Sequence, residues 1–184
     1  MARLLDRYKE EIAPALMQAL ALKNAMAVPR LKKVVVSMGA GSPTQDKKRL
    51  PAAVDDLAKI TGQKPQIRRA TKSVSNFKIR EDDEVGCRVT LRGRRMYEFV
   101  DRLINAAIPR MRDFRGLNPQ SFDGRGNYAM GVADQSIFSE IDLAKLTYNQ
   151  GMNIVFVTSA RKDSDARELL ARLGMPFRRT EIAG

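Results

Sequence analysis

The stretch from Gly62 to Arg94 constrains the fold more than any other part of the chain, because it combines two predicted strands with a polar segment that cannot be buried in a hydrophobic core. It holds two short strand-like runs, 65–70 and 86–92, joined by a long polar segment with few large apolar residues. Between Leu57 and Arg80 the chain has no acid, and its cations there are Lys59, Lys64, Arg68, Arg69, Lys72, Lys78 and Arg80. Cations this close together repel one another, so the segment favours a polyanionic partner.

The whole chain is strongly basic. It has 184 residues, with 33 Lys and Arg against 21 Asp and Glu, which gives a net charge of +12. A surplus of this size on a small protein is typical of nucleic-acid binding and less often of an anionic membrane surface. The length is typical of one domain, and repeats and linkers are absent, so we predict a single domain over residues 1–184.

The composition disfavours an enzyme. The chain has no histidine, which removes the commonest general base, the Ser-His and Cys-His nucleophile pairs and most zinc sites. Its one cysteine, Cys87, can make no internal disulfide. We therefore expect no catalytic residues, no metal site and no cofactor. The N-terminus lacks a signal-peptide core and no apolar run is long enough to span a membrane, which predicts a cytosolic protein with no membrane partner.

The apolar periodicity predicts an α+β fold. Helices are expected over 2–23, 46–61, 94–112 and 163–174, and strands over 31–38, 65–70, 86–92, 127–132 and 151–158. Residues 71–85 are too long and too polar for a hairpin turn and are predicted to be an extended loop. This order indicates a mostly antiparallel sheet with helices packed on one face, leaving the other face and the long basic loop to bind RNA.

The non-core positions of three predicted strands carry polar and basic side chains. They are Lys33, Ser37, Gln66, Arg68, Arg88, Thr90 and Arg92. A solvated sheet face would also explain one such strand. If the three strands are neighbours, they form a polar, basic sheet face, which favours contacts to phosphates and 2′-hydroxyls of folded RNA. No DNA-binding helix motif is visible, and aromatic residues are too few for a base-stacking platform.

Two motifs have alternative interpretations. Gly39-Ala40-Gly41 follows a strand, as in a dinucleotide-binding loop, but the third glycine and the distant acid are missing, so a tight turn is the simpler explanation. Asp82, Asp83 and Glu84 could hold a metal ion in an enzyme, but consecutive carboxylates on an extended loop point in alternating directions, which favours a solvated acidic loop. A free-standing RNA chaperone is a further alternative to a ribosomal role.

Several motifs together resemble one family. They are VPRLKKVVVSMGAG, TGQKP, KSVSNFKIRE, GCRVTLRG, MYEFVDRLI, PRMRDFRGL, SFDGRGNYAMGV and MPFRR. The chain resembles, over nearly its whole length, the bacterial large-subunit ribosomal protein five family, which binds 5S rRNA in the central protuberance. The resemblance implies a structural ribosomal protein without enzymatic activity.

The resemblance also implies roles for individual residues. It assigns 5S rRNA contact to Lys33, Ser37, Gly39, Gln63, Lys64, Arg68, Thr90 and Arg92. It assigns contact with P-site tRNA, through the 71–85 loop, to Lys72, Ser73, Asn76, Phe77, Lys78 and Arg80. The family typically has asparagine at Ser37, and it has a glycine followed by an apolar residue or proline where this chain has its acidic run 82–84.

The remaining partners follow from the same resemblance. They are 23S rRNA, other large-subunit proteins of the central protuberance and a protein of the small-subunit head, reached through an intersubunit bridge. The loops 112–118 and 133–146 are candidates for that bridge.

Overall fold

We describe the protein from a computed structural model, which covers residues 2–41, 48–142, 144, 146 and 148–178. Its chain contacts divide it into two compact units. Unit 1 comprises 1–34, 91–130 and 155–184, and unit 2 comprises 35–90 and 131–154. The prediction of a single domain over residues 1–184 is not tested by this division and stays a prediction.

The described residues form five strands in one antiparallel sheet, in the order β2-β3-β1-β5-β4. Their bounds are β1 Leu31–Gly39, β2 Gln66–Arg69, β3 Glu84–Leu91, β4 Tyr128–Val132 and β5 Met152–Thr158. The predicted α+β fold with a mostly antiparallel sheet is therefore confirmed. β5 has a neighbour on each side, as its apolar sequence predicts, although β1 is the middle strand.

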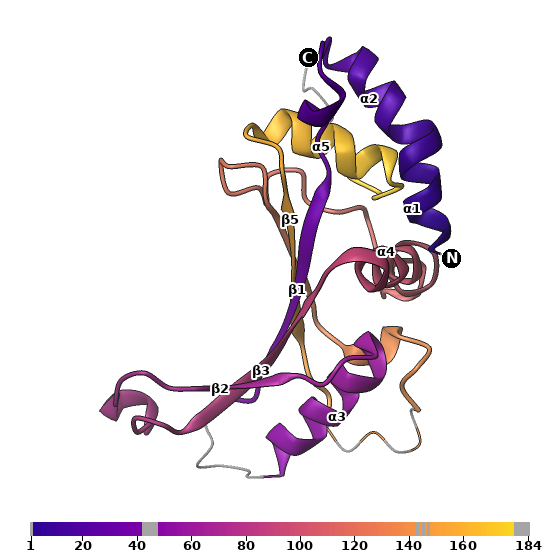
Figure 1. The fold of residues 1–184 in the computed structure, drawn as a ribbon. Coiled ribbons are helices and arrows are strands. Elements are labelled where there is room, and N and C mark those ends of the chain that lie inside the picture. Colours follow the sequence, from indigo (N-terminus) through magenta and orange to yellow (C-terminus); the bar gives the residue numbers. More distant parts are fainter. Residues whose placement is uncertain (1, 42–47, 143, 145, 147, 179–184) are drawn as a thin grey trace, which may run out of the picture. The chain divides into compact units, whose positions relative to one another are not determined.

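In unit 1 the helices lie on one side of the strand segments (Figure 1). They are α1 Arg3–Arg7, α2 Ala13–Ala19, α4 Gly93–Arg102 and α5 Asp163–Arg172. The apolar stripe of the helical region that begins with α4 is largely buried: Phe99, Val100 and Leu103 are at most 1% exposed. Arg3 on α1 reaches Asp101 on α4 at 3.0 Å, and a π-helical turn, Tyr8–Ile12, joins α1 to α2 just before Pro14.

In unit 2 helix α3, Arg49–Thr61, lies on one side of its strand segments. Leu57 and Ile60 of α3 are fully buried, as is Val36 of β1. Gly62 ends the helix in the left-handed conformation, with φ of 64°, and its N–H donates to the carbonyl oxygen of Ala58. Glycine adopts this conformation without a Cβ penalty, so the predicted helix end is confirmed.

Several predicted boundaries were wrong by a few residues. The first helical region ends at Ala19, not at residue 23, and the helix predicted to reach 112 ends at Arg110 after a π turn and a 3-10 turn. β2 and β4 are slightly shorter than predicted, and β5 begins at Met152. The predicted start of α3 at Asp46 lies outside the described residues. Helices and strands often end in frayed or irregular turns, and the spacing of apolar residues does not locate those ends to the residue.

β3 begins at Glu84, two residues before the predicted start at Gly86. The predicted loop of residues 71–85 therefore includes the first part of a strand. The prediction missed Glu84 and Val85 because they join β3 through backbone hydrogen bonds to the neighbouring strands. Such bonds do not depend on the alternation of apolar and polar side chains.

Candidate nucleic-acid interface

The candidate 5S rRNA-binding residues fall into both units. Lys33 and Arg92 belong to unit 1, where Lys33 is half-buried on β1 and Arg92 is exposed at the N-cap of α4. The other candidates belong to unit 2: Ser37, Gly39, Gln63, Lys64, Arg68 and Thr90.

The strands of unit 2 turn their polar side chains away from the core. Val36 and Met38 of β1 are buried, so Ser37 between them lies on the opposite side of the strand. On β3, Cys87 and Val89 are buried, while Thr90 is half-buried. The predicted alternation of these strands is confirmed, and it exposes a polar strand side in unit 2.

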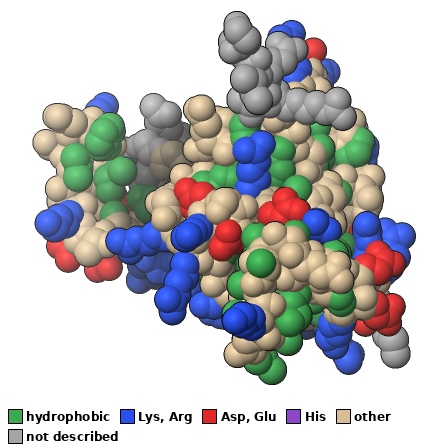
Figure 2. All heavy atoms as spheres, turned by 90° about the horizontal axis from the view of Figure 1, so that it is seen from above, with side chains coloured by type: hydrophobic (Ala, Val, Ile, Leu, Met, Phe, Trp, Pro, Cys, Tyr) green, Lys and Arg blue, Asp and Glu red, His purple; other side chains and the backbone are tan. Residues whose placement is uncertain are grey.

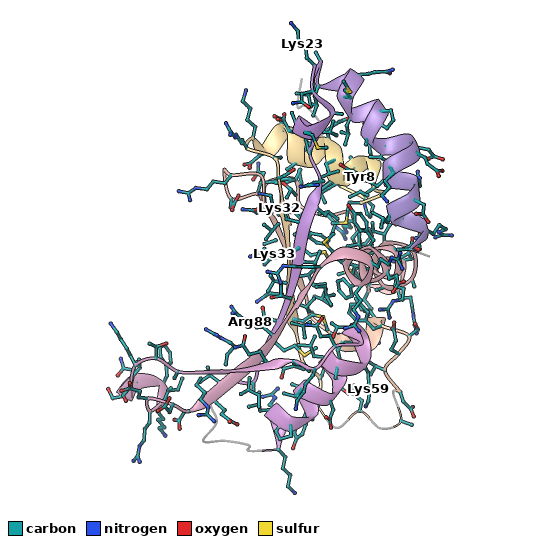
Figure 3. All side chains as sticks on the ribbon, in the orientation of Figure 1. Tyr8, Lys23, Lys32, Lys33, Lys59 and Arg88 are labelled. Carbon is teal, nitrogen blue, oxygen red and sulfur yellow. The ribbon has the colours of Figure 1, made fainter. Side chains whose placement is uncertain are left out.

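Arg88 lies on this polar side and was omitted from the candidate residues, although its alternation with Cys87 and Val89 marks it. It is exposed, and its Nε donates to Oε1 of Gln66 on β2 at 3.4 Å. Figure 3 shows Arg88 on the side of β3 turned away from α3, which carries Lys59. We add Arg88 to the unit 2 candidates and call these seven residues the sheet-face set.

The short strand β2 is exposed at every position and pairs antiparallel with β3. Arg68 lies opposite Gly86, and Arg69 lies opposite Glu84, so the register skips Val85 and forms a bulge. A bulge of this kind bends the strand pair and increases its twist. Arg69 also pairs with Glu84 at 3.3 Å, whereas Arg68 forms no ion pair with any described residue.

Gly86 allows β3 to approach β1 at this bend. A Cβ on Gly86 would lie 2.6 Å from the carbonyl oxygen of Met38, closer than real Cβ contacts allow. The neighbouring N–H of Ala40 donates to the carbonyl oxygen of Val85 at 3.0 Å. The glycine is therefore required by the close approach of two backbones. The carbonyl oxygen of Gly39 at this bend accepts a hydrogen bond from Gln150 Nε2 at 2.6 Å.

The turn after α3 is fastened to the strands by side-chain hydrogen bonds. Thr61 Oγ1 donates to the carbonyl oxygen of Leu57 at 2.7 Å, and Gln63 Nε2 donates to the carbonyl oxygen of Thr90 at 3.4 Å. The adjoining Lys64 is exposed. Gln63 therefore has a structural contact besides its predicted role at the RNA, and it holds Lys64 beside β3.

Residues 70–83 form an ordered excursion between β2 and β3, which we call the arm. Its base is closed by Ala70 N–H donating to Asp83 O at 2.8 Å and by Asp82 N–H donating to Ala70 O at 3.0 Å. Nearer its tip, Val74 and Ile79 exchange two backbone hydrogen bonds around a 3-10 turn, Ser75–Phe77. The prediction of an extended loop did not include this pairing, because backbone hydrogen bonds order a segment that has no apolar periodicity.

The candidate tRNA-binding residues all lie on this arm and are exposed: Lys72, Ser73, Asn76, Phe77, Lys78 and Arg80. Phe77 is 68% exposed and Val74 is 41% exposed. Figure 2 shows hydrophobic side chains gathered on the arm, with cations at its edges. Large apolar side chains at such exposure cost free energy in water and mark contact surfaces.

The acidic run has structural contacts. Oδ2 of Asp83 accepts a hydrogen bond from the Arg80 N–H, and Glu84 is paired with Arg69. Asp82 is exposed in the left-handed conformation, with φ of 66°. Throughout the described ranges, no three acids, cysteines or histidines converge as metal ligands. The alternative of a metal centre at these three acids is therefore not supported.

The Gly39-Ala40-Gly41 turn is followed by residues 42–47, which the structure does not describe. Gly41 has φ of 71°, a conformation that glycine adopts readily, which agrees with the tight-turn interpretation. Among the described helices, none has the length and apolar character required of a membrane span.

Comparisons with known proteins cover almost the whole chain. A family model described as "Ribosomal protein L5" matches residues 24–80, and one described as "ribosomal L5P family C-terminus" matches residues 84–177. Large ribosomal subunit protein uL5 of Rubrobacter xylanophilus is 59% identical over 178 residues, which cover 97% of this chain and 99% of that protein. The protein of the same name from Clostridium botulinum is 56% identical over 179 residues, with coverage of 97% and 99%. Residues 81–83, which include Asp82 and Asp83 of the acidic run, fall between the two family matches.

Proposed function

The chain belongs to the bacterial ribosomal protein L5 family, and on this premise we propose that it binds 5S rRNA with its sheet-face set and reaches P-site tRNA with its arm. Membership of this family makes the chain a structural, non-enzymatic constituent of the large subunit of the cytoplasmic ribosome, with ribosomal RNA among its partners.

The polar side of the unit 2 strands supports the proposed contact with 5S rRNA. Arg68 and Arg88 lie on adjacent antiparallel strands and are exposed, and neither forms an ion pair with a described residue. The paired strands hold the backbones of these two arginines at a fixed spacing, which positions both side chains for phosphates. Ser37 and Thr90 add hydroxyl groups that can bond phosphates or 2′-hydroxyls.

Binding of isolated 5S rRNA over a range of salt concentrations tests this proposal. Arg88→Gln should weaken binding several-fold and reduce the slope of log affinity against log salt by roughly 1, because one phosphate contact is lost. Lys59→Gln on α3 removes the same charge from another side of unit 2 and should leave both quantities near wild type. Equal affinities for the two variants would exclude the polar strand side as the 5S rRNA contact.

The exposed apolar tip of the arm supports the tRNA proposal. Phe77 and Val74 stand among Lys72 and Arg80, a combination suited to stacking on an unpaired base while the cations contact its backbone. Of the acids nearby, Asp83 accepts a hydrogen bond from the Arg80 N–H and Glu84 pairs with Arg69, whereas Glu81 and Asp82 are exposed and leave negative charge beside this surface.

Ribosomes rebuilt with variant protein test the arm. Phe77→Ala should reduce P-site tRNA affinity by roughly 1–3 kcal/mol, the usual loss of one stacked base, while Phe77→Tyr should retain it. Met26→Ala is a matched control, because Met26 is also highly exposed, at 88%, but lies in unit 1. Unaltered tRNA affinity in Phe77→Ala ribosomes would exclude stacking by this ring.

The bridge to the small-subunit head remains a proposal on the loops 112–118 and 133–146. In the first loop, Gly116 packs against the backbone of Arg178, and Asp113 has φ of 50°. In the second, a 3-10 turn, Gln135–Ile137, is capped by Asp134, and residues 143 and 145 are not described. Crosslinkers placed at Arg115 and Ser139 should capture a small-subunit head protein in whole ribosomes, and capture of large-subunit components alone would exclude both loops.

A further inference from the structure

We propose that the open edge of β2 is a docking site for an extended acidic segment of another protein, which adds to the sheet as a further strand. The inference goes beyond the proposed RNA contacts, because it uses the backbone groups of β2 that point away from β3. The whole site lies within unit 2.

β2 is the last strand at one side of the sheet, and among the described residues it pairs only with β3. Figure 1 shows it running beside β3 toward the arm. All four of its residues are exposed. An edge strand presents a row of backbone N–H and C=O groups without partners, and such a row can pair with an extended segment of another chain.

The hydrogen bonds at the base of the arm show which backbone groups lie on this open edge. Ala70 N–H donates to Asp83 O at 2.8 Å, and Asp82 N–H donates to Ala70 O at 3.0 Å, so both backbone groups of Ala70 point toward β3. The extra residue of the bulge belongs to β3, so the alternation along β2 is uninterrupted. Because successive residues of a strand direct these groups to opposite edges, Ile67 and Arg69 direct theirs away from β3.

The side chains of β2 determine which segment fits. Ile67 is 42% exposed and lies opposite the buried Cys87, so it offers an added strand an apolar contact at the margin of the core. Arg68 lies on the other side of the strand pair, is exposed and forms no ion pair with a described residue. Directly opposite residues of adjacent strands share a side of the sheet. The partner therefore needs an apolar residue beside Ile67 and an acid beside Arg68.

The charge around the open edge favours an acidic partner over a second copy of this chain. Residues 64–69 contain three cations and no acid, and of these cations only Arg69 is paired, with Glu84 of β3 at 3.3 Å. Opposite charges across two strands stabilise a sheet, whereas like charges destabilise it. Two copies that paired through β2 would bring arginines close to arginines. The edge therefore repels its own copy and attracts an acidic strand.

The backbone pattern favours a protein strand over RNA as the occupant. The outward carbonyl oxygens of Ile67 and Arg69 accept hydrogen bonds from N–H groups, which phosphates lack. An RNA backbone would use the cations alone and would leave Ile67 exposed. An added strand supplies both donors and acceptors and covers this apolar side chain as well.

Titration with a synthetic peptide tests the open edge. The probe alternates glutamate and valine over about eight residues, enough to span β2. Its control contains the same residues with all the glutamates first. We expect the alternating peptide at saturation to slow hydrogen exchange about tenfold at the outward amides of Ile67 and Arg69 in the full-length protein. The amide of Arg68 already faces β3 and should change little.

A pair of variants at one position tests the backbone contact. Ile67→Pro removes the outward N–H and keeps the hydrogen bonds to β3, because an edge strand tolerates proline where the nitrogen faces away from its neighbour. Ile67→Thr keeps the N–H and is the matched control, and thermal unfolding checks that both variants fold. We expect Ile67→Pro to bind the alternating peptide about five- to tenfold more weakly than Ile67→Thr, the effect of roughly one backbone hydrogen bond.

Equal exchange with the two peptides, or equal peptide affinity of the two variants, would overturn the proposal. Slower exchange at Ile67 and Arg69 that depends on protein concentration alone would identify a second copy as the occupant, and slower exchange with 5S rRNA but neither peptide would identify RNA. Either result would also overturn it. The exchange measurement uses the wild-type chain, so it decides the matter even if Ile67→Pro does not fold. Arg88→Gln, measured with 5S rRNA alone, reports on the sheet-face set separately, so the two proposals fail independently.

Discussion

Asp83 accepts a hydrogen bond at Oδ2 from the backbone N–H of Arg80, over 2.7 Å, within an arm that carries both cations and acids. An acid that looks unfavourable for an RNA-binding loop thus closes a turn at the base of that loop. The same turn is reinforced by the Asp83 N–H, which donates to the carbonyl oxygen of Arg80 at 3.2 Å. Asp83 therefore orders the arm.

Asp83→Ala should loosen the arm without unfolding the protein. We expect faster hydrogen exchange at the amides of Arg80 and Asp83, and a global cost of about 1 kcal/mol or less, because the bond is exposed to solvent. Glu81→Ala is the matched control, since it removes one acid from the same turn but keeps the Asp83 carboxylate. If Arg80 exchanged equally fast in both variants, Asp83 would have no ordering role.

Gly86→Ala should destabilise unit 2 where β3 crosses β1. The new Cβ would meet the carbonyl oxygen of Met38 at 2.6 Å, and because this atom belongs to the backbone, the strands must shift. We expect a loss of about 1–3 kcal/mol in the free energy of unfolding, the usual cost of overpacking, measured by urea denaturation.

Gly39→Ala provides the control on the opposite strand, because a Cβ there meets no atom within 4 Å. It should change stability by a few tenths of a kcal/mol. If Gly39 also contacts 5S rRNA, this variant should bind the RNA less tightly while remaining as stable as the wild type. Equal destabilisation at Gly39 and Gly86 would show that the close approach at Gly86 is not the cause.

Cys87 should behave as an inert thiol at neutral pH. Its side chain is 1% exposed, and burial, partly offset by a hydrogen bond with the Met38 backbone, raises its pKa from 9.0 to about 11. Because the folded-state pKa lies above the unfolded value, the thiol's contribution to stability is complete below pH 9.0 and is lost as the pH rises toward 11.

The measurement is the free energy of unfolding as a function of pH for the wild type and for Cys87→Ala. The difference between the two should be constant below the unfolded pKa of 9.0 and should shrink above it. Labelling with a thiol reagent at neutral pH should be slow in the native protein and fast in urea. Rapid labelling without denaturant would contradict the burial of this thiol.

We also predict that the two units unfold in one cooperative transition, as a single domain over residues 1–184 requires. Four strands, β1, β3, β4 and β5, each contribute residues to both units, so neither unit can lose its strands without disturbing the chain of the other. Tyrosine fluorescence reports mainly on unit 1, which holds Tyr8, Tyr97 and Tyr128, and labelling of Cys87 reports on unit 2.

Urea titrations followed by these two probes should give coincident midpoints. Separate midpoints would show that the units are independent domains and would overturn the single-domain prediction. The chain lacks tryptophan, so the tyrosine signal is free of that stronger fluorophore.

The sequence by itself determined the fold class, the main helices and the alternation of β1 and β3. Apolar spacing identifies Val36, Met38, Cys87 and Val89 as core residues because burial of one side of a strand requires alternation. The same alternation marked Arg88 as outward, although it was left out of the candidate residues.

Only the tertiary structure decided the order of the arm and which strands pair. The arm is held by backbone bonds such as Val74 to Ile79, which depend on pairing across the turn and leave no side-chain pattern. Arg30 and Ser159 are far apart in the sequence and exchange hydrogen bonds only because β1 and β5 are neighbours in the sheet. Sequence periodicity reports which side of an element is buried, whereas strand pairing decides which elements meet.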